Sequence, residues 1–246
     1  MGFYGGNYKK RATVGELKLK AEKSLKKLKK KNPDDIRPVI IEGTKIAKCW
    51  WGKAWNDNLE RYSDYENRIG RGKSYLKNGM VLDLRIKEGE AEAIVQGSRV
   101  KPYDVGIYIE PLKKEIWESI VKDCQGRIES LQELIEGKFP KELSELLTAK
   151  GKGLFPAPDE IDFHCTCPDW ADMCKHVAAV LYGIGTRIDN NPELLFTLRG
   201  VNIDELISKT IEKKSEELLK KSTKKSKRAI VDEAVSDIFG IDIDGN

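Results

Sequence analysis

Residues 163–176 have the sequence Phe-His-Cys-Thr-Cys-Pro-Asp-Trp-Ala-Asp-Met-Cys-Lys-His, which contains the pattern C-x-C-x6-C-x-H. Three of the chain's five cysteines and one of its two histidines fall within this pattern. No secretory signal opens the chain, and in a reducing compartment such clusters bind metal rather than form disulfides. Zinc takes four nitrogen or sulfur ligands in a tetrahedron. We therefore expect one closed, structural Zn2+ site with four ligands: Cys165, Cys167, Cys174 and His176.

The spacing of these residues predicts the local structure that holds them. Alternating side-chain directions along a strand place Cys165 and Cys167 on one face. His164 then points to the other face, which makes it the less favoured alternative ligand. Pro168 ends the strand, and the apolar run at 177–182 predicts a helix packed against the metal site.

Two charged residues of the stretch have expected local roles. Asp169 is predicted to cap a helix or to form a turn. Lys175 lies between two ligands, where it would offset the net negative charge that three thiolates leave on the ion. The alternative to a metal site is a cluster of reduced, buried cysteines around a core histidine.

These residues resemble the SWIM zinc finger, whose motif is C-x-C-x(n)-C-x-H, and all four ligand positions match. The chain also resembles the stand-alone prokaryotic SWIM proteins that are often found beside a Swi/Snf-type helicase. This resemblance covers residues 45–200 and includes Trp-Trp-Gly-Lys-Ala-Trp at 50–55, Val-Gln-Gly-Ser-Arg at 95–99, Pro-Tyr at 102–103 and Leu-Arg-Gly at 198–200. It implies a structural zinc ion, binding to DNA or to protein, and a Swi/Snf-type helicase as a partner.

Composition sets broad limits on the class of protein. Hydrophobic residues make up 39% of the 246 residues and charged residues 34%, with a formal net charge of +4 and a pI of about 8.6. This balance is typical of a soluble, mildly basic protein and does not by itself require a nucleic-acid partner. No apolar run approaches the ~20 residues of a membrane span. We expect no membrane partner and a cytoplasmic location.

Hydrophobic periodicity predicts an α+β fold. Alternating apolar residues indicate three antiparallel strands, at 80–87, 91–96 and 103–109, and a further short strand is expected at 39–41. Three- and four-residue steps indicate helices at 13–31, 50–65, 111–149, after the metal stretch and at 201–221. The expected architecture is a small antiparallel β-meander with several helices, plus a zinc-stabilised SWIM lobe.

We expect the chain to be organised in five segments. These are a basic N-terminal arm and helix at 1–35, an α+β body at 36–150, the SWIM zinc finger and following helices at 151–200, a helix at 201–221, and a charged linker with an amphipathic tail at 222–246. The apolar stripe of the tail is predicted to dock either on this chain or in a partner's groove.

Tryptophan and cysteine residues outside the metal stretch have expected roles in packing. Trp51 and Trp55 are four residues apart and share a helical face, which favours the core over base stacking or a partner contact. Cys49 and Cys124 are expected to be reduced packing residues.

Basic side chains cluster in three segments that are candidates for phosphate contact. The first is the lysine-rich helix that follows Thr13, for which a solvated surface or an unfolded arm is the alternative. The second is residues 68–79, where Gly-Lys-Ser at 72–74 imitates a phosphate loop but lacks the required glycine at position 67. The third is the loop at 96–102, which a plain turn explains equally well. The candidates are Lys26, Lys27, Lys29, Lys30, Arg68, Arg71, Lys73, Lys77, Arg99 and Lys101.

Residues for catalysis are scarce in this chain. Both histidines lie at the metal stretch, and neither a nucleophile elbow nor a nucleotide loop is present. We therefore expect a non-enzyme that binds nucleic acid, with DNA favoured over RNA, without reading sequence, and that assists a helicase or another DNA-processing machine. Two alternatives remain, a protein-interaction adaptor without nucleic-acid affinity and an RNA- or ribosome-associated factor.

Overall fold

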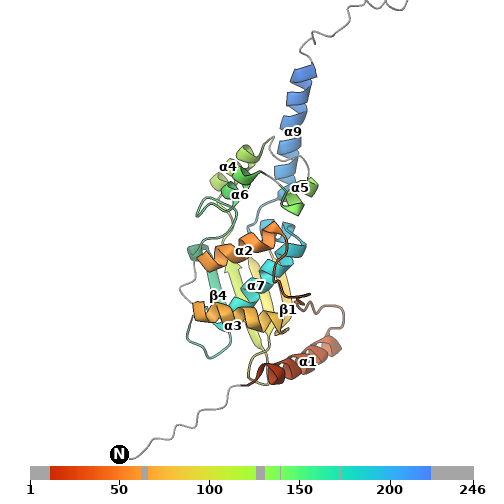
Figure 1. Ribbon diagram of the computed structural model, residues 1–246, viewed down its shortest axis with the longest axis vertical. Helices are drawn as coiled ribbons and strands as arrows, with labels where there is room; N and C mark the ends of the chain where they lie inside the picture. The colour runs from red at the N-terminus through yellow and green to blue at the C-terminus, as the bar shows by residue number, and fades with distance from the viewer. Residues whose placement is uncertain (1–11, 62–65, 126–130, 139, 172, 223–246) are drawn as a thin grey trace, which may run out of the picture.

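A computed structural model describes residues 12–61, 66–125, 131–138, 140–171 and 173–222 (Figure 1). It confirms the expected α+β class, with α-helices around one four-stranded antiparallel sheet. The strands are β1 (Val81–Lys87), β2 (Glu90–Val95), β3 (Tyr103–Ile109) and β4 (Ile161–Cys165). None of the helices in the described ranges combines the length and apolar character that a bilayer-crossing helix needs.

The sheet has the order β1-β2-β3-β4, so sequential strands are neighbours. The three strands predicted from alternation form the meander, and Gly89 takes the positive φ of 67° in the tight turn between β1 and β2. β4 adds to the edge of this meander by pairing with β3, with Cys165 opposite Val105. The strand that ends in the first metal ligand is therefore part of the main sheet.

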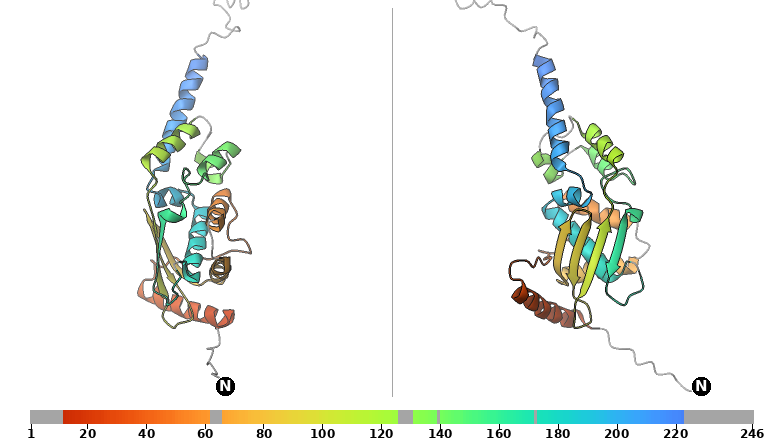
Figure 2. Two further views of the ribbon diagram at one scale, coloured as in Figure 1. Left: turned by 90° about the vertical axis from the view of Figure 1, so that its left-hand side faces the viewer. Right: turned by 180° about the vertical axis from the view of Figure 1, so that it is seen from behind.

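Within the described ranges, helices cover one face of the sheet. The central helix is α7 (Lys175–Asn190), which packs between the sheet and a layer formed by α2 (Trp50–Arg61) and α3 (Glu66–Lys77) (Figures 1 and 2). Nearly every side chain of α7 is buried. In the described part of the chain no helix covers the opposite face, which Figure 2 shows from behind.

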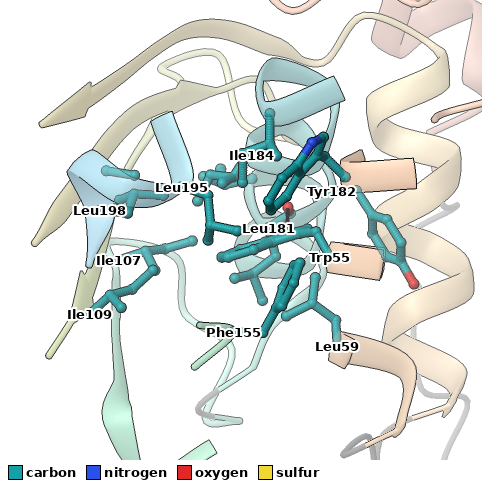
Figure 3. Close-up of a cluster of buried hydrophobic side chains, with 14 of the residues drawn as sticks. Trp55, Leu59, Ile107, Ile109, Phe155, Leu181, Tyr182, Ile184, Leu195 and Leu198 are labelled. Atoms are coloured by element: carbon teal, nitrogen blue, oxygen red, sulfur yellow. Dashed lines mark hydrogen bonds between the residues drawn. The ribbon is translucent and has the colours of Figure 1, made fainter. Parts of the chain in front are cut away.

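The core between these layers contains the two tryptophans predicted to lie there. Trp51 and Trp55 are fully buried. The indole N–H of Trp55 donates to the Leu181 carbonyl at 2.9 Å, and that of Trp51 donates to the Leu134 carbonyl at 2.8 Å. Figure 3 shows Trp55 packed among aliphatic side chains of α7, α8 (Glu193–Leu198) and the sheet. Each buried indole therefore keeps a hydrogen bond.

The lysine-rich helix is ordered against the rest of the protein. α1 (Val14–Lys31) begins with a capping box in which Thr13 and Glu16 bond each other's backbone N–H groups. Its apolar side chains Leu17 and Ala21 are buried. Leu17 and Ala21 thus anchor α1, while most of its lysines face outward.

The remaining helices agree with the predicted periodicity. They are α4 (Lys114–Cys124), α5 (Leu131–Glu136), α6 (Lys141–Leu147), the short 3-10 helix η1 (Pro158–Glu160), α8 and α9 (Ile203–Ser222). The Trp117 indole N–H donates to Glu205 at 2.8 Å and joins α4 to α9. Residues 1–11 of the predicted N-terminal segment (1–35) and residues 223–246 of the predicted linker and tail (222–246) lie outside the described residues.

The prediction of a strand at 39–41 is wrong, because the structure has no strand there. Only two backbone bonds connect this segment with β1, from the Val39 N–H to Val81 and from the Leu84 N–H to Arg37. The pairing runs antiparallel and Val39 already faces Val81, the first residue of β1, so Ile40 and Ile41 extend past the end of that strand and the ladder does not continue.

The cysteines outside the finger pack as predicted. Cys124 is buried, and Cys49 donates its thiol to the Asp189 carbonyl at 3.3 Å. Neither forms a disulfide with a described cysteine.

Candidate metal centre

Four ligand side chains meet where β4 ends and α7 begins. Cys165 is the last residue of β4, Cys167 follows two residues later, Cys174 is the N-cap of α7, and His176 lies in its first turn. Their sulfur and ring nitrogen atoms all lie within 4.8 Å of one another. The two pairs of ligands are therefore brought together by one strand end and one helix start.

The distances between these atoms fit zinc. The Nδ1 atom of His176 lies 3.9 Å from the Cys165 sulfur and 3.7 Å from the Cys174 sulfur. Zn–S bonds of about 2.3 Å and Zn–N bonds of about 2.0 Å at tetrahedral angles require S···N distances of about 3.6 Å. The donor set of three thiols and one imidazole is also the kind that selects zinc over hard cations. The residues present fit a closed tetrahedral site in which Nδ1 is the nitrogen ligand.

Pairing between β3 and the residues after β4 sets the direction of the two cysteines. The Thr166 N–H donates to the Asp104 carbonyl at 3.1 Å, and the Asp104 N–H donates to the Thr166 hydroxyl at 3.0 Å. Extended backbone at this point keeps Cys165 and Cys167 on one side of the sheet. His164 lies opposite Gly106 on the other side and is exposed. The structure thus excludes His164 from the ligand group, as predicted.

The ring of His176 is enclosed by aromatic side chains. It lies 4.6 Å from the Tyr103 ring and 5.5 Å from the Tyr75 ring, centroid to centroid. With Nδ1 directed at the sulfurs, the ring proton must sit on Nε2, which is buried and has no hydrogen-bond partner among the described residues. Packing rather than a second hydrogen bond therefore orients this ligand.

The thiols differ in their affinity for protons. A hydrogen bond from Cys165 lowers the pKa of Cys174, and His176 and the Val177 N–H act in the same direction. The same interaction with Cys174, together with burial, raises the pKa of Cys165, and burial raises that of Cys167. Zinc binds cysteine as the thiolate, so binding is expected to release the protons that the thiols hold.

The loop between Cys167 and Cys174 is tied to α3. Asp169 forms an ion pair with Arg68, and both side chains are largely buried. Asp169 is therefore a bridging residue and not a helix cap, since Cys174 occupies the N-cap of α7. Lys175 lies with its ammonium 5.8 Å from the centre of the Tyr75 ring, at the edge of the site.

Residues 159–183, which span β4, this loop and the first half of α7, match the family model of the SWIM zinc finger. The chain carries a SWIM zinc finger. The match and the four-residue cluster together identify a structural zinc site. The SWIM finger shares its sheet and its helix with the α+β body, because β4 pairs with β3 and α7 packs against α2 and α3.

A similar protein is known from Mycobacterium tuberculosis, where it is described as Uncharacterized protein Rv2102. It is 31% identical over 185 residues, which cover 72% of this chain and 66% of the relative. The alignment thus spans just under two thirds of the relative's own length. No solved structure matches the chain.

The structure places the ten candidate phosphate-contacting residues on three elements near the SWIM finger. Arg68 and Lys73 have internal partners, since Arg68 pairs with Asp169 and Lys73 with Glu60 at 2.7 Å. Eight others are exposed and form no ion pair with a described residue: Lys26, Lys27, Lys29, Lys30, Arg71, Lys77, Arg99 and Lys101. We refer to these eight residues as the basic surface.

Sequence reasoning missed the residue that joins these elements. Gln96 is fully buried, and its side-chain amide donates to the carbonyls of Gly97 and Arg99 at 2.9 and 2.8 Å. Its carbonyl accepts a hydrogen bond from Ser24 of α1 at 2.7 Å. The sequence shows only that a polar residue, Gln96, ends a predicted strand. That position does not reveal its partner Ser24, which is 72 residues away in the sequence.

Proposed function

We propose that this chain binds nucleic acid through the basic surface beside its SWIM finger, with DNA as the favoured ligand and without reading sequence. In this role it would be a non-enzymatic accessory factor of a helicase or another DNA-processing machine. The observation that carries the proposal is that every element of the basic surface is joined to the zinc end of the molecule by direct contacts.

The contacts can be followed from one element to the next. From α3, Tyr75 packs on the zinc ligand His176. From the loop between β2 and β3, Arg99 lies 6.0 Å from the ring of Tyr103, which packs on the same histidine. From α1, the ammonium of Lys20 donates to the Ser98 carbonyl of that loop at 2.8 Å. Such contacts would couple zinc binding to the placement of these three elements.

The cations of the basic surface suit a phosphate backbone. They are exposed and form no ion pair with a described residue. No such ion pair would therefore have to break when they contact phosphates. Each phosphate neutralised by such a side chain releases condensed counterions, which drives binding at low salt. No base-reading module is recognisable in the sequence, so the contacts would position a strand without specifying its sequence.

The open face of the sheet is a poor alternative site for nucleic acid. The hollow on this face is lined by carboxylates from β1, β2 and β3; Asp83 and Glu92 are paired with Arg85 and Lys87, whereas Glu90 and Asp104 form no ion pair with a described residue. Carboxylates repel phosphate, so the charge on this face disfavours nucleic acid. The basic surface is therefore the better candidate.

Salt-dependent binding of the zinc-loaded full chain to a labelled duplex tests the proposal. Affinity should fall steeply between about 50 and 200 mM salt. Replacing Arg71, Lys77 and Lys101 by glutamine should weaken binding at every sequence and flatten the plot of log K against log salt by about 2 to 3, if each contacts one phosphate.

A matched control removes the same charge from the far end of the molecule. Lys113, Lys114 and Lys122 are exposed and belong to α4 or precede it, away from α1 and α3 (Figure 1). Their replacement by glutamine should leave the salt slope unchanged. Equal loss in both triple variants, or no binding by the unmodified chain, would show that the basic surface is not a nucleic-acid site.

A second candidate function is that of a protein-interaction adaptor, and the open sheet face favours it. Tyr108 is 48% exposed on this face beside the carboxylates, which is a surface suited to a basic protein segment. Affinity purification with and without nuclease separates the two functions. A helicase retained after nuclease treatment, from a chain without nucleic-acid affinity, would favour the adaptor.

A further inference from the structure

The exposure of Trp170 is the feature that the proposed function leaves unexplained. Its relative exposure is 89%, whereas Trp51, Trp55 and Trp117 are buried. Tryptophan has a large apolar surface and is enriched among the residues that anchor contacts, so an exposed indole on a folded segment is a candidate contact residue.

The backbone on both sides of Trp170 is anchored. Asp169 before it is fixed to α3 by the ion pair with Arg68. Ala171 after it is buried, and its N–H donates to the Asp169 carboxylate at 3.5 Å. The SWIM finger holds both ends of the loop through Cys167 and Cys174. The indole is therefore presented outward from a segment whose neighbours face inward.

Basic residues of α3 and α7 lie near the loop that carries Trp170. Arg68 reaches the adjacent residue, and Arg71 follows one helical turn later on the exposed side of α3, about 4.5 Å along the axis. Tyr75 lies on the same face of α3 as Arg68 and Arg71. The ammonium of Lys175 lies 5.8 Å from the centre of the Tyr75 ring. Because Arg68 is already paired with Asp169, Arg71 is the exposed cation of this part of α3 that forms no ion pair with a described residue.

A flat aromatic ring beside a row of cations is the arrangement that binds unpaired nucleotides. Bases of a single strand expose their faces and stack on aromatic side chains, while cations follow the backbone. In a duplex the same faces are covered by neighbouring base pairs. Protein partners also use tryptophan as an anchor, but the exposed Arg71 of α3 and Lys175 near this loop favour phosphate over an apolar pocket.

We infer that Trp170 is a stacking platform for an unpaired base and that the SWIM finger end binds single-stranded nucleic acid in preference to duplex. This inference rests on the proposed function and refines it by naming the ligand. The strand would cross the loop at Trp170 and run along Arg71 of α3. DNA and RNA share this chemistry, and the test below distinguishes them.

The experiment compares the zinc-loaded full chain with its Trp170→Ala and Trp170→Phe variants. The probes are a labelled oligo-dT of about 20 nucleotides, the matching oligo-U, and a duplex of the same length; a single-strand-binding domain covers about 4–16 nucleotides. The unmodified chain should bind the single strands more tightly than the duplex. Trp170→Ala should weaken single-strand binding about 5- to 150-fold and leave duplex binding unchanged, while Trp170→Phe should retain most of it.

Tryptophan fluorescence gives a second readout. Stacking should quench part of the emission when oligo-dT is added, and this quenching should disappear in Trp170→Ala. Ile40→Ala is the matched control, because Ile40 is 71% exposed and lies beside Asn190 at the opposite end of α7. It should bind every probe as the unmodified chain does.

The outcomes separate this inference from the proposed function. Equal affinity for strand and duplex, or unchanged oligo-dT binding by Trp170→Ala, would overturn the stacking role and leave salt-dependent binding in place. No binding to any probe would overturn both. A preference between oligo-dT and oligo-U, with the same loss in Trp170→Ala, would support the inference, and repeating the comparison with oligo-dU against oligo-U, which differ only in the sugar, would identify the natural sugar.

Discussion

Gly97 and His176 approach so closely that a Cβ atom on residue 97 would lie 2.9 Å from the Nε2 atom of the zinc ligand. The same atom would lie 2.3 Å from the Tyr103 ring. Real Cβ atoms do not tolerate such distances, so the position accepts only glycine without rearrangement. A glycine in the loop of the basic surface is thus explained by packing against the finger rather than by approach to phosphate.

Gly97→Ala should displace the His176 ring and weaken zinc binding about 10- to 100-fold, which is the usual effect of disturbing the support of a metal ligand. Competition with a zinc-binding dye measures this change. Gly70→Ala is the matched control, since Gly70 lies on the exposed face of α3 with nothing within 4 Å of its Cβ position. It should keep zinc affinity and gain up to about 1 kcal/mol of stability.

Loss of a zinc ligand should destabilise the whole protein, because α7 and β4 belong to its main core. Cys174→Ser and His176→Ala should each lower the zinc content below one equivalent per chain. Structural zinc binding is coupled to folding, so the free energy of unfolding should fall by at least ~3 kcal/mol and the melting temperature by about 6–12 °C.

Metal analysis and thermal melting of the same samples check this result. His164→Ala serves as the control, because His164 points away from the site and should retain both zinc and melting temperature. Stoichiometric zinc and unchanged melting in the Cys174 and His176 variants would mean that the ligand set is wrong.

The zinc site could be predicted because its information is local. Few residue types bind zinc, and the spacing of Cys165, Cys167, Cys174 and His176 alone matches a strand end followed by a helix start. The meander was equally accessible, since the alternation along β1, β2 and β3 matches the sheet face that they bury.

Contacts between distant segments could not be predicted in the same way. The bond between Ser24 and Gln96 and the ion pair between Arg68 and Asp169 join residues that no periodicity relates. The exposure of Trp170 also carries no local signal, because tryptophan is usually packed. The strand predicted at 39–41 failed because Val39 already faces the first residue of β1, Val81, so among the described residues Ile40 and Ile41 have no strand beside them to pair with.

Removal of Arg199 should be among the most destabilising single substitutions. Its guanidinium is 1% exposed and donates to the Glu110 carbonyl at 2.6 Å and to the Glu160 carboxylate at 2.9 Å. These bonds connect α8, the end of β3 and the 3-10 helix at the start of the SWIM match. Arg199→Met would leave Glu160 without this partner, at a cost of about 3–5 kcal/mol.

Urea denaturation of Arg199→Met and of Lys141→Ala measures the difference. Lys141 forms an exposed pair with Glu145 at 3.3 Å, and such a pair contributes about 0–1 kcal/mol. Similar stability losses in the two variants would contradict a structural role for the buried guanidinium.

Tyr182 should make the protein less stable at alkaline pH. Burial, and then the hydrogen bond from its hydroxyl to Glu60 at 2.8 Å, raise the pKa of this phenol above its ordinary value of 10.0. Above about pH 10 the unfolded chain therefore releases a proton that the folded chain keeps. The stability contributed by Tyr182 is complete below pH 10 and is lost as the pH rises beyond it, by up to about 1.4 kcal/mol per pH unit.

Tyr182→Phe removes this titration and should flatten the decline of unfolding free energy between about pH 10 and 11. Tyr108→Phe, at an exposed tyrosine, should leave the decline as it is. Parallel pH profiles for the unmodified chain and Tyr182→Phe, followed by urea denaturation, would show that Tyr182 does not couple folding to alkaline pH.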